Sequence, residues 1–228
     1  MKRRRPIDSI RESYDRLADE YARRIFNELG QKPFDRELLD RFAARVDGRG
    51  PICDMGCGPG QVARYLRDRG ASVSGIDLSP GMVEQACRLN PDISFQPGDM
   101  LDLAIDDGHF AGIAAFYAIV NIPPDHLPRA FREMHRVLRP DGLLLLAFHM
   151  GDEVLHENEL WGRPISMDFF LFRPALIQQH AEAAGFVVEE MLEREPYGPD
   201  VEYQSRRAYM LARANKKPTG PSLHTTRC

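Results

Sequence analysis

The sequence predicts an α/β fold: a doubly wound, seven-stranded and mostly parallel sheet of the Rossmann-like type. From residue 52 onward, short apolar runs alternate with amphipathic helical segments, which is the order expected of a parallel sheet with crossover helices. The runs at 110–120 and 143–149 are almost wholly apolar, as is typical of strands buried on both faces. A glycine cluster at 56–60 separates the first run from a helix.

The composition excludes several classes of protein. The chain has 228 residues, is 43% apolar and 28% charged, and carries a formal net charge of −4. These values are ordinary for a globular domain and give no general attraction to nucleic acid. The longest apolar runs are shorter than the ~20 residues of a membrane helix, so we expect no membrane partner. The sequence gives no prediction of oligomeric state.

The cysteines favour a reducing compartment. Their spacing matches neither a disulfide framework nor a zinc site, and they lie at four positions, Cys53, Cys57, Cys87 and Cys228. We therefore expect a cytoplasmic protein without a bound metal. The charged start of the chain is not followed by the apolar core of an export signal.

Two helices are predicted before the sheet, forming a helical cap over residues 1–48. Apolar side chains between residues 10 and 25 recur at steps of three and four, which marks one face of a helix. Ser9 and Glu12 have the spacing of a capping box for it. A second helix is expected over 35–46.

The next elements alternate between strand and helix. Strands are predicted at 52–55, 73–77, 93–96 and within 110–120. Ser79 precedes Pro80 as an N-cap would, so a helix is expected from there through Leu89. An amphipathic helix over 127–138 is predicted to end in a turn at 139–142, before the fifth strand at 143–149.

The last third of the chain is less regular. Residues 151–173 contain four aromatic side chains without a clean period, and we expect a lid-like insertion there. A helix over 174–184 is predicted to end at Gly185. Two final strands, 186–193 and 207–214, are close enough in sequence to pair antiparallel. The prediction is one domain over 1–214, followed by a polar tail over 215–228.

The glycine loop indicates a cationic nucleotide-like ligand. Ligands of open α/β sheets bind at the carboxyl ends of the strands, and Asp77 lies 19 residues after Gly58, as for an acid that accepts from a ribose. Gln61 breaks the dinucleotide pattern. Asp54 would oppose a diphosphate, because like charges ~6 Å apart cost about 3 kcal/mol. An ammonium group suits it better, and S-adenosylmethionine carries an ammonium, a ribose diol and no phosphate.

At this point a resemblance can be named. Residues 50–150 resemble class I S-adenosylmethionine-dependent methyltransferases, especially the small-molecule branch similar to ubiquinone and menaquinone methyltransferases. Four segments carry it in family order, and they are residues 54–60 (DMGCGPG), 75–79 (GIDLS), 98–100 (GDM) and 136–142 (RVLRPDG).

The resemblance implies which residues hold the methionine part of S-adenosylmethionine. Gly56 and Gly58 would line it, and Asp54 would reach its ammonium through a water or the backbone. Phe116, near the end of the fourth strand, would lie beside the methionine chain, although packing in the core explains it equally well.

The resemblance also implies a ribose and adenine site. Asp77 would bridge the ribose hydroxyls, and Leu78 would lie against the adenine. Asp99 would accept from the adenine amino group, with Met100 beside it. Simple turn formation remains the alternative for Asp99.

Three residues are candidates for contact with the reacting groups. Tyr14 and Tyr21 are two helical turns apart on one face of the first helix, which in similar enzymes folds over the cofactor. Anchoring that helix is the alternative role. His149 ends the fifth strand, where a general base could face the acceptor, although a structural histidine is the alternative. Tyr117 is a weaker candidate for the same pocket.

The predicted function is transfer of a methyl group from S-adenosylmethionine to a small-molecule acceptor. One alternative is a nucleotide-dependent, NAD-type oxidoreductase, which Asp54 and Gln61 disfavour. A nucleic-acid or protein methyltransferase is another, supported only by the basic residues near the two termini. A non-catalytic cofactor-binding regulator is the last. The identity of the acceptor and of its methylated atom stays open.

Overall fold

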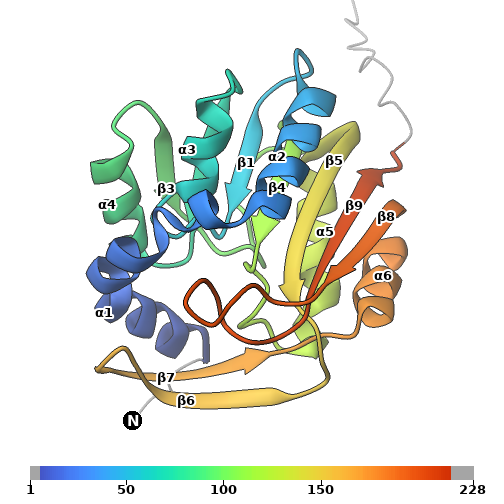
Figure 1. Ribbon diagram of the computed structural model, residues 1–228. Helices are drawn as coiled ribbons and strands as arrows, with labels where there is room; N and C mark the ends of the chain where they lie inside the picture. Colours follow the sequence, from blue (N-terminus) through green and yellow to red (C-terminus); the bar gives the residue numbers. More distant parts are fainter. Residues whose placement is uncertain (1–5, 217–228) are drawn as a thin grey trace, which may run out of the picture.

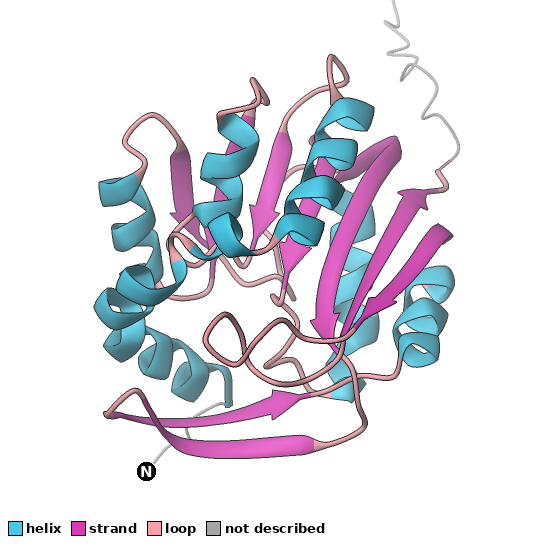
Figure 2. Ribbon diagram, in the orientation of Figure 1, coloured by secondary structure: helices cyan, strands magenta, loops and turns pink. Residues whose placement is uncertain are grey.

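The computed structural model describes residues 6–216 and shows a central sheet with helices on both faces (Figures 1 and 2). The strands are β1 (Ile52–Met55), β2 (Val73–Asp77), β3 (Ser94–Pro97), β4 (Phe110–Phe116), β5 (Leu138–His149), β6 (Val154–Leu160), β7 (Arg163–Phe170), β8 (Phe186–Arg194) and β9 (Arg207–Ala214). The helices are α1 (Pro6–Ile25), α2 (Pro33–Val46), α3 (Gln61–Arg67), α4 (Pro80–Leu89), α5 (Leu127–Val137) and α6 (Pro174–Ala183), with short 3₁₀ helices η1 (Glu28–Gln31) and η2 (Pro124–His126).

Seven strands form the main sheet, in the order β3-β2-β1-β4-β5-β9-β8. The pairs from β3 to β5 are parallel, and β9 runs antiparallel to both β5 and β8. The predicted fold class is therefore confirmed. The strand order reverses between β1 and β4, so the switch point, where ligands of such sheets bind, lies at the carboxyl ends of these two strands.

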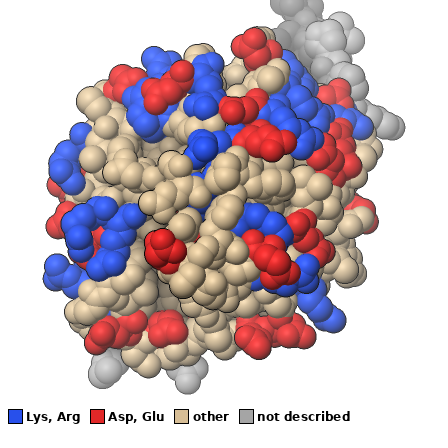
Figure 3. All heavy atoms as spheres, viewed as in Figure 1, with Lys and Arg blue, Asp and Glu red and all other residues tan. Residues whose placement is uncertain are grey.

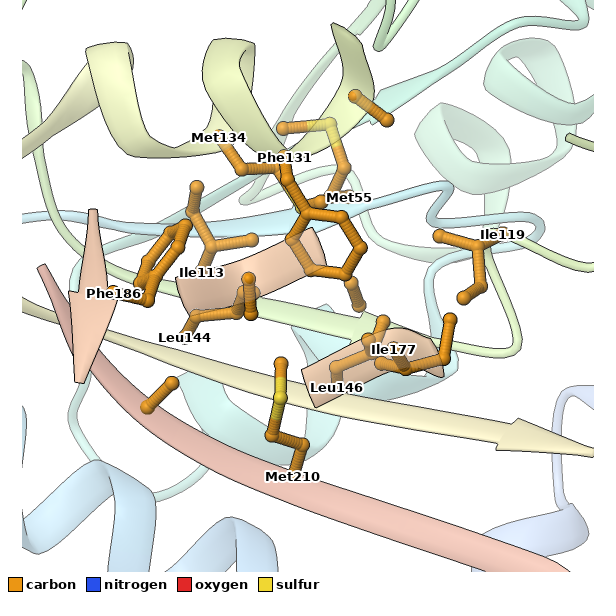
Figure 4. Packing of buried hydrophobic residues seen from close by; sticks show 14 of the residues in the cluster. Met55, Ile113, Ile119, Phe131, Met134, Leu144, Leu146, Ile177, Phe186 and Met210 are labelled. Carbon is orange, nitrogen blue, oxygen red and sulfur yellow. The ribbon is translucent and has the colours of Figure 1, made fainter. Parts of the chain in front are cut away.

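Alternate side chains of the central strands enter two separate cores. Ile113 of β4 and Leu144 of β5 pack with α5 and α6, where Phe131 and Ile177 meet them (Figure 4). Ala114 and Leu145 point to the opposite face and pack against α2. This alternation explains the continuous apolar runs in the sequence, because both faces of the strands are covered.

Residues 151–173 contain an antiparallel hairpin, β6–β7, rather than irregular chain. The hairpin lies beyond the carboxyl edge of the main sheet, beside α1 (Figure 1). Leu17 of α1 forms a small apolar cluster with Ile165 and Met167 of β7. Of the four aromatic residues that obscured the period, Trp161 and Phe169 pack against α1. Tertiary contacts, and not a local pattern, therefore determine the structure of this segment.

Two local predictions were wrong. Ser9 does not cap the first helix, because α1 already includes Pro6, and the Ser9 hydroxyl instead donates to the Ser166 carbonyl of β7 (3.1 Å). Residues 139–142 do not separate a helix from a strand but form an irregularity inside β5. Phe110 pairs with Leu138, and two residues later Gly112 already pairs with Leu143.

The other predicted elements agree with the structure to within a few residues. The second helix begins two residues early, at Pro33, and β3 lies one residue later than expected. Ser79 caps α4 as predicted, its hydroxyl oxygen accepting from the Met82 N–H. Of the predicted polar tail, residues 217–228 lie outside the described residues, as do the basic residues 2–5.

Candidate functional site

The glycine loop between β1 and α3 is held close to two neighbouring segments. Gly56 has φ +68°, and a Cβ atom there would lie 2.6 Å from the Cβ of Ala118, which follows β4. Its N–H donates to the carbonyl of Ile76 in β2 (2.7 Å). The Met100 methyl is 3.7 Å from the same Cβ position. Gly56 is thus required by a positive φ and by a close approach, and Met100 lies beside the loop.

The carboxylate of Asp54 is buried at the first turn of α3. One carboxylate oxygen accepts from the Ala63 N–H (2.8 Å), and only 2% of the residue is exposed. Burial raises the pKa of this carboxyl to about 7, against the opposing effect of the Ala63 bond. The side chain therefore fixes the glycine loop to the first turn of α3 and exchanges a proton near neutral pH.

Asp77, at the end of β2, binds the glycine loop from the other side. It accepts from the Gly58 N–H (2.8 Å) and from the Ser79 N–H (2.9 Å). Burial raises its pKa to about 6, and the charge of Asp15 on α1 adds to the rise. Asp15 itself accepts from the Ser79 hydroxyl (2.6 Å), so α1 is fastened directly over this edge.

Tyr14 and Tyr21 lie over the glycine loop, with their ring centroids 6.2 Å apart. An edge carbon of Tyr21 is 3.7 Å from the Cβ position of Gly58. The Tyr14 hydroxyl donates to Asn121 Oδ1 (2.7 Å). Burial raises the pKa of both phenols, so both are neutral donors at physiological pH.

Asn121 joins α1 to the hairpin, a role the sequence did not reveal. While its Oδ1 accepts from Tyr14, its Nδ2 donates to the Asp168 carbonyl of β7 (2.7 Å). Gln61 was also missed as a site residue. Its Oε1 is buried without a hydrogen-bond partner and lies 4.0 Å from the Cβ position of Gly58. This unused acceptor at the loop suits a ligand that donates N–H groups.

The remaining predicted cofactor residues are placed less informatively. Asp99 is half-buried and accepts from the Leu101 N–H (2.9 Å), which is the turn geometry considered as its alternative role. Leu78 is half-buried directly after Asp77. Phe116, the last residue of β4, has its ring centroid 6.4 Å from those of both Tyr117 and Tyr209.

A second group of side chains lies at the ends of β4 and β5. The rings of Tyr117 and His149 are 4.9 Å apart, and His149 Nδ1 is 2.8 Å from the Ser205 hydroxyl. Tyr117 has φ 57°, a conformation that is strained for a bulky residue. Burial lowers the pKa of His149 to about 3, and the charges of Arg207 and Lys32 lower it further. His149 is thus neutral at physiological pH and a weak base.

A buried ionic network surrounds this second group, centred on Glu202 in the β8–β9 loop. Both oxygens of Glu202 accept from Arg194, and one also accepts from the Tyr197 N–H (2.7 Å). Lys32 Nζ lies 3.6 Å from the same carboxylate and 2.6 Å from that of Glu28. These bonds lower the pKa of Glu202 to about 2 despite its burial. The network fastens the loop to the start of α2.

Residues 6–216 contain no group of three or more His, Cys, Asp or Glu side chains that could hold a metal ion. Within the same described range, every helix is too short or too polar to cross a membrane. On the face shown in Figure 3, basic and acidic side chains alternate, without one large basic area.

Comparison with known proteins gives agreeing results. Residues 52–142 match the family model described as "Methyltransferase domain". Over 158 residues the chain is 30% identical to a malonyl-[acyl-carrier protein] O-methyltransferase of Enterobacter lignolyticus, covering 68% of this chain and 60% of that protein. It is 33% identical over 137 residues to a demethylmenaquinone methyltransferase of Beutenbergia cavernae, covering 58% and 55%. The chain thus spans less than two thirds of the length of these curated relatives.

A solved structure has the same fold. The complex of DhpI with S-adenosylhomocysteine (SAH) superposes with a TM-score of 0.71 at 19% identity, covering 93% of this chain and 98% of that one. Because it covers 93% of this chain, the likeness extends beyond residues 52–142, which match the family model.

Proposed function

Because residues 52–142 are a methyltransferase domain of the S-adenosylmethionine-dependent class, we propose that this protein transfers a methyl group from S-adenosylmethionine to a small-molecule acceptor. One observation carries the proposal. Two carboxylates, the buried Asp54 and the half-buried Asp77, lie near the ends of neighbouring parallel strands on either side of the glycine loop. That edge attracts a cationic ligand and repels a phosphate.

The side chains present fit S-adenosylmethionine. Gly56 leaves no room for a Cβ, and Gln61 offers an unused buried acceptor beside Gly58, as an ammonium group requires. Asp77 presents a carboxylate for the ribose diol. Asp54, through α3, would hold the loop in the conformation that receives the methionine end. Leu78, Asp99 and Met100 would bound the adenine.

S-adenosylmethionine supplies a methyl group bound to a positively charged sulfur. In the transfer, a bond forms between the acceptor atom and the methyl carbon, the carbon–sulfur bond breaks, and its electron pair stays on sulfur. The protein contributes mainly position, because in-line placement of reacting atoms ~3–3.5 Å apart supplies much of the acceleration. Tyr14 and Tyr21 cover the loop and exclude water from it. His149 and Tyr117 would face the acceptor.

His149 is proposed to orient the acceptor rather than to remove its proton. A base with a pKa near 3 is almost fully unprotonated at pH 7 but has little affinity for a proton from the acceptor. Its Nδ1 is already engaged with the Ser205 hydroxyl. The predicted contact role at the end of the fifth strand is thus kept, and general-base catalysis is not part of the proposal.

We propose further that residues 1–214 act as one domain in a reducing cytoplasm, with no nucleic-acid partner. The described part of the chain builds one seven-stranded sheet. Three cysteines in it are free, at positions Cys53, Cys57 and Cys87. The intermingled surface charges in Figure 3 offer no extended contact for a phosphate backbone.

Calorimetry and thermal unfolding with SAH and with NAD test the function. We expect SAH to bind and to stabilise the protein by about 2.7 kcal/mol at a concentration of 100 times its Kd. NAD should leave the unfolding temperature unchanged. Stabilisation by NAD and not by SAH would overturn the proposal. A single turnover with S-adenosylmethionine and a pool of metabolites should yield SAH, and a protein that binds SAH without this turnover would be a regulator.

A further inference from the structure

Arg207, the first residue of β9, is a buried cation without a directly bonded anion. Only 2% of the residue is exposed. Its Nη1 donates to the Ser205 carbonyl and hydroxyl, and its Nη2 donates to the Tyr203 carbonyl (2.7 Å). All these acceptors are uncharged. The carboxylate of Glu202 stands 3.7 Å from Nη2, beyond hydrogen-bond distance, and the buried Nε–H has no partner.

This arrangement is unusual for a buried guanidinium. A buried charge is costly unless it is paired, and buried N–H groups are nearly always bonded. Glu202 compensates the charge only in part, because its oxygens accept from Arg194 and it makes no hydrogen bond to the Arg207 Nε–H. The nearest aromatic ring, that of Tyr117, lies 5.4 Å from the guanidinium carbon and gives only partial compensation. An anionic ligand oxygen would supply the missing partner.

The position of Arg207 places its unpartnered Nε–H at the acceptor side of the proposed site. Arg207 is the register partner of His149 across β5 and β9. Lys32 Nζ lies 5.5 Å from the centre of the same Tyr117 ring, and Lys32 is 4% exposed. Two buried cations therefore flank the Tyr117 ring. Tyr117 directly follows β4, which pairs with β1, the strand that leads into the glycine loop.

The neighbouring groups do not serve an acceptor that must first lose a proton. Burial lowers the pKa of His149 and raises that of Tyr117, so neither takes up a proton at neutral pH. Glu202 is engaged by Arg194. An acceptor that is already anionic requires no base, since its oxygen is nucleophilic as it arrives.

We propose that the methyl acceptor is a carboxylate, held by Arg207 Nε–H with Lys32 beside it. The inference rests on the proposed methyl transfer and specifies its substrate class. One carboxylate oxygen attacks the methyl carbon, an oxygen–carbon bond forms, and the carbon–sulfur bond breaks with its electron pair on sulfur. No proton moves. The products are SAH and a neutral methyl ester, which has lost the charge that Arg207 holds and is therefore released.

Benzoate and benzamide are matched probes, since they have the same shape and differ in charge, and the rings of Tyr117, His149 and Tyr203 offer an aromatic surface. Each is titrated calorimetrically into SAH-saturated protein. We expect benzoate to bind and benzamide to bind at least tenfold more weakly. Arg207→Gln should weaken benzoate binding at least tenfold and leave SAH affinity unchanged. Equal binding of the two probes, no saturable benzoate binding, or an unaffected Arg207→Gln variant would overturn the proposal.

Two further variants separate binding from folding and from net charge. Arg206→Gln removes the same charge from the adjacent residue, whose side chain is 52% exposed, and should bind benzoate like the wild type. Arg207→Lys keeps the charge without the Nε–H and should recover only part of the affinity. Equal losses in Arg206→Gln and Arg207→Gln would reduce the effect to net charge. The titration can be repeated without SAH. A wild-type protein that binds benzoate through Arg207 but does not bind SAH would support the carboxylate site and contradict only the proposed methyl transfer.

Discussion

The carboxyl edge of the sheet divides into two halves that differ in whether they contain buried cations. In the acidic half, at the ends of β1 and β2, the ionisable groups are the carboxylates of Asp54, which is buried, and Asp77, which is half-buried. Both accept hydrogen bonds from backbone N–H groups. In the basic half, at the ends of β4 and β5 and the start of β9, the buried cations Lys32 and Arg207 flank Tyr117. This half also contains the carboxylates of Glu28, Asp35 and Glu202, which form ion pairs with Lys32 and Arg194. One edge thus offers an acidic site for a cationic cofactor and a basic site for the group that receives the methyl.

The two halves are also built differently. The acidic half consists of the glycine loop and the adjoining ends of β1 and β2. These parts lie within one segment of about 25 residues, from Asp54 to Asp77. The basic half joins residues from the start of α2, the end of β5 and the β8–β9 loop. Its cohesion comes from buried ion pairs, which are costly to break because each partner is left uncompensated.

Removal of Glu202 should have the largest effect. Glu202→Ala leaves Arg194 with only one of its two carboxylate partners, Asp35, and Lys32 with only one of its two, Glu28. We expect a loss of about 3–5 kcal/mol in the free energy of unfolding, measured by urea titration. The exposed ion pair between Arg206 and Glu195 offers a control, since Glu195→Ala should lower the free energy of unfolding by no more than about 1 kcal/mol. If the two variants lose the same stability, the network does not hold the basic half together.

The sequence predicted the acidic half well and the basic half poorly, for a physical reason. Asp54, Gly56 and Asp77 are identifiable because a strand, a tight loop and a helix start must follow one another at fixed spacing. Arg207 and Glu202 stand in no local pattern. Their contacts depend on how β8 and β9 pair and on where α2 begins, which are distant in sequence. His149 was found as a strand end, but its neutral state follows from burial, and then from cations, that only the fold provides.

The hairpin shows the same limit. Trp161 and Phe169 pack on α1, about 150 residues earlier in the chain, whereas Phe170 and Phe172 join the main core. Neither a strand period nor a helix period is therefore visible over 151–173. Asn121 belongs to no local sequence pattern that marks it as a site residue. Its two bonds, to Tyr14 and to the Asp168 carbonyl, require both partners to be placed first.

Asp77→Ala should weaken SAH binding strongly, by about 10- to 100-fold, because a hydrogen bond to a charged group contributes about 1.5–3 kcal/mol. His149→Gln, in the basic half, should leave the SAH affinity within about twofold of the wild type. Isothermal titration of both variants measures the contrast. A similar loss in the two variants would mean that the halves are not separate binding sites.

The two halves should respond oppositely to pH. The pKa of Asp77 is raised to about 6, so between pH 4 and 6 the folded state binds more protons and stability falls as pH rises. The pKa of His149 is lowered to about 3, so the unfolded state binds more protons and stability rises with pH until about 6.5. Each contributes at most about 1.4 kcal/mol per pH unit.

Urea unfolding at several pH values from 4 to 7 separates these contributions. Asp77→Asn should make stability rise more steeply with pH than in the wild type, and His149→Gln should make it rise less steeply. Asp106→Asn, which removes an exposed carboxylate, is the control and should leave the slope nearly unchanged. Slopes that change in the same direction in both site variants would contradict the opposite pKa shifts of Asp77 and His149.

The smallest expected effect tests whether Asn121 couples α1, which covers the acidic half, to the β6–β7 hairpin. Tyr14→Phe removes one neutral hydrogen bond and should cost about 1 kcal/mol, since Asn121 keeps its bond to the hairpin. Asn121→Ala breaks both bonds. In the double variant the Tyr14 substitution should therefore cost almost nothing further, a coupling that a double-mutant cycle measures directly.

Ser13→Ala provides the matched control for this cycle. Its hydroxyl accepts from the Ser166 N–H of β7 (3.2 Å) and ties α1 to the hairpin without Asn121. Because the two connections share no atom, the costs of Ser13→Ala and Asn121→Ala should add within about 0.5 kcal/mol. Additive costs for Tyr14 and Asn121 as well would mean that α1 covers the acidic half independently. A coupling seen only for Tyr14 would make Asn121 the point where the cover of the cofactor side meets the hairpin.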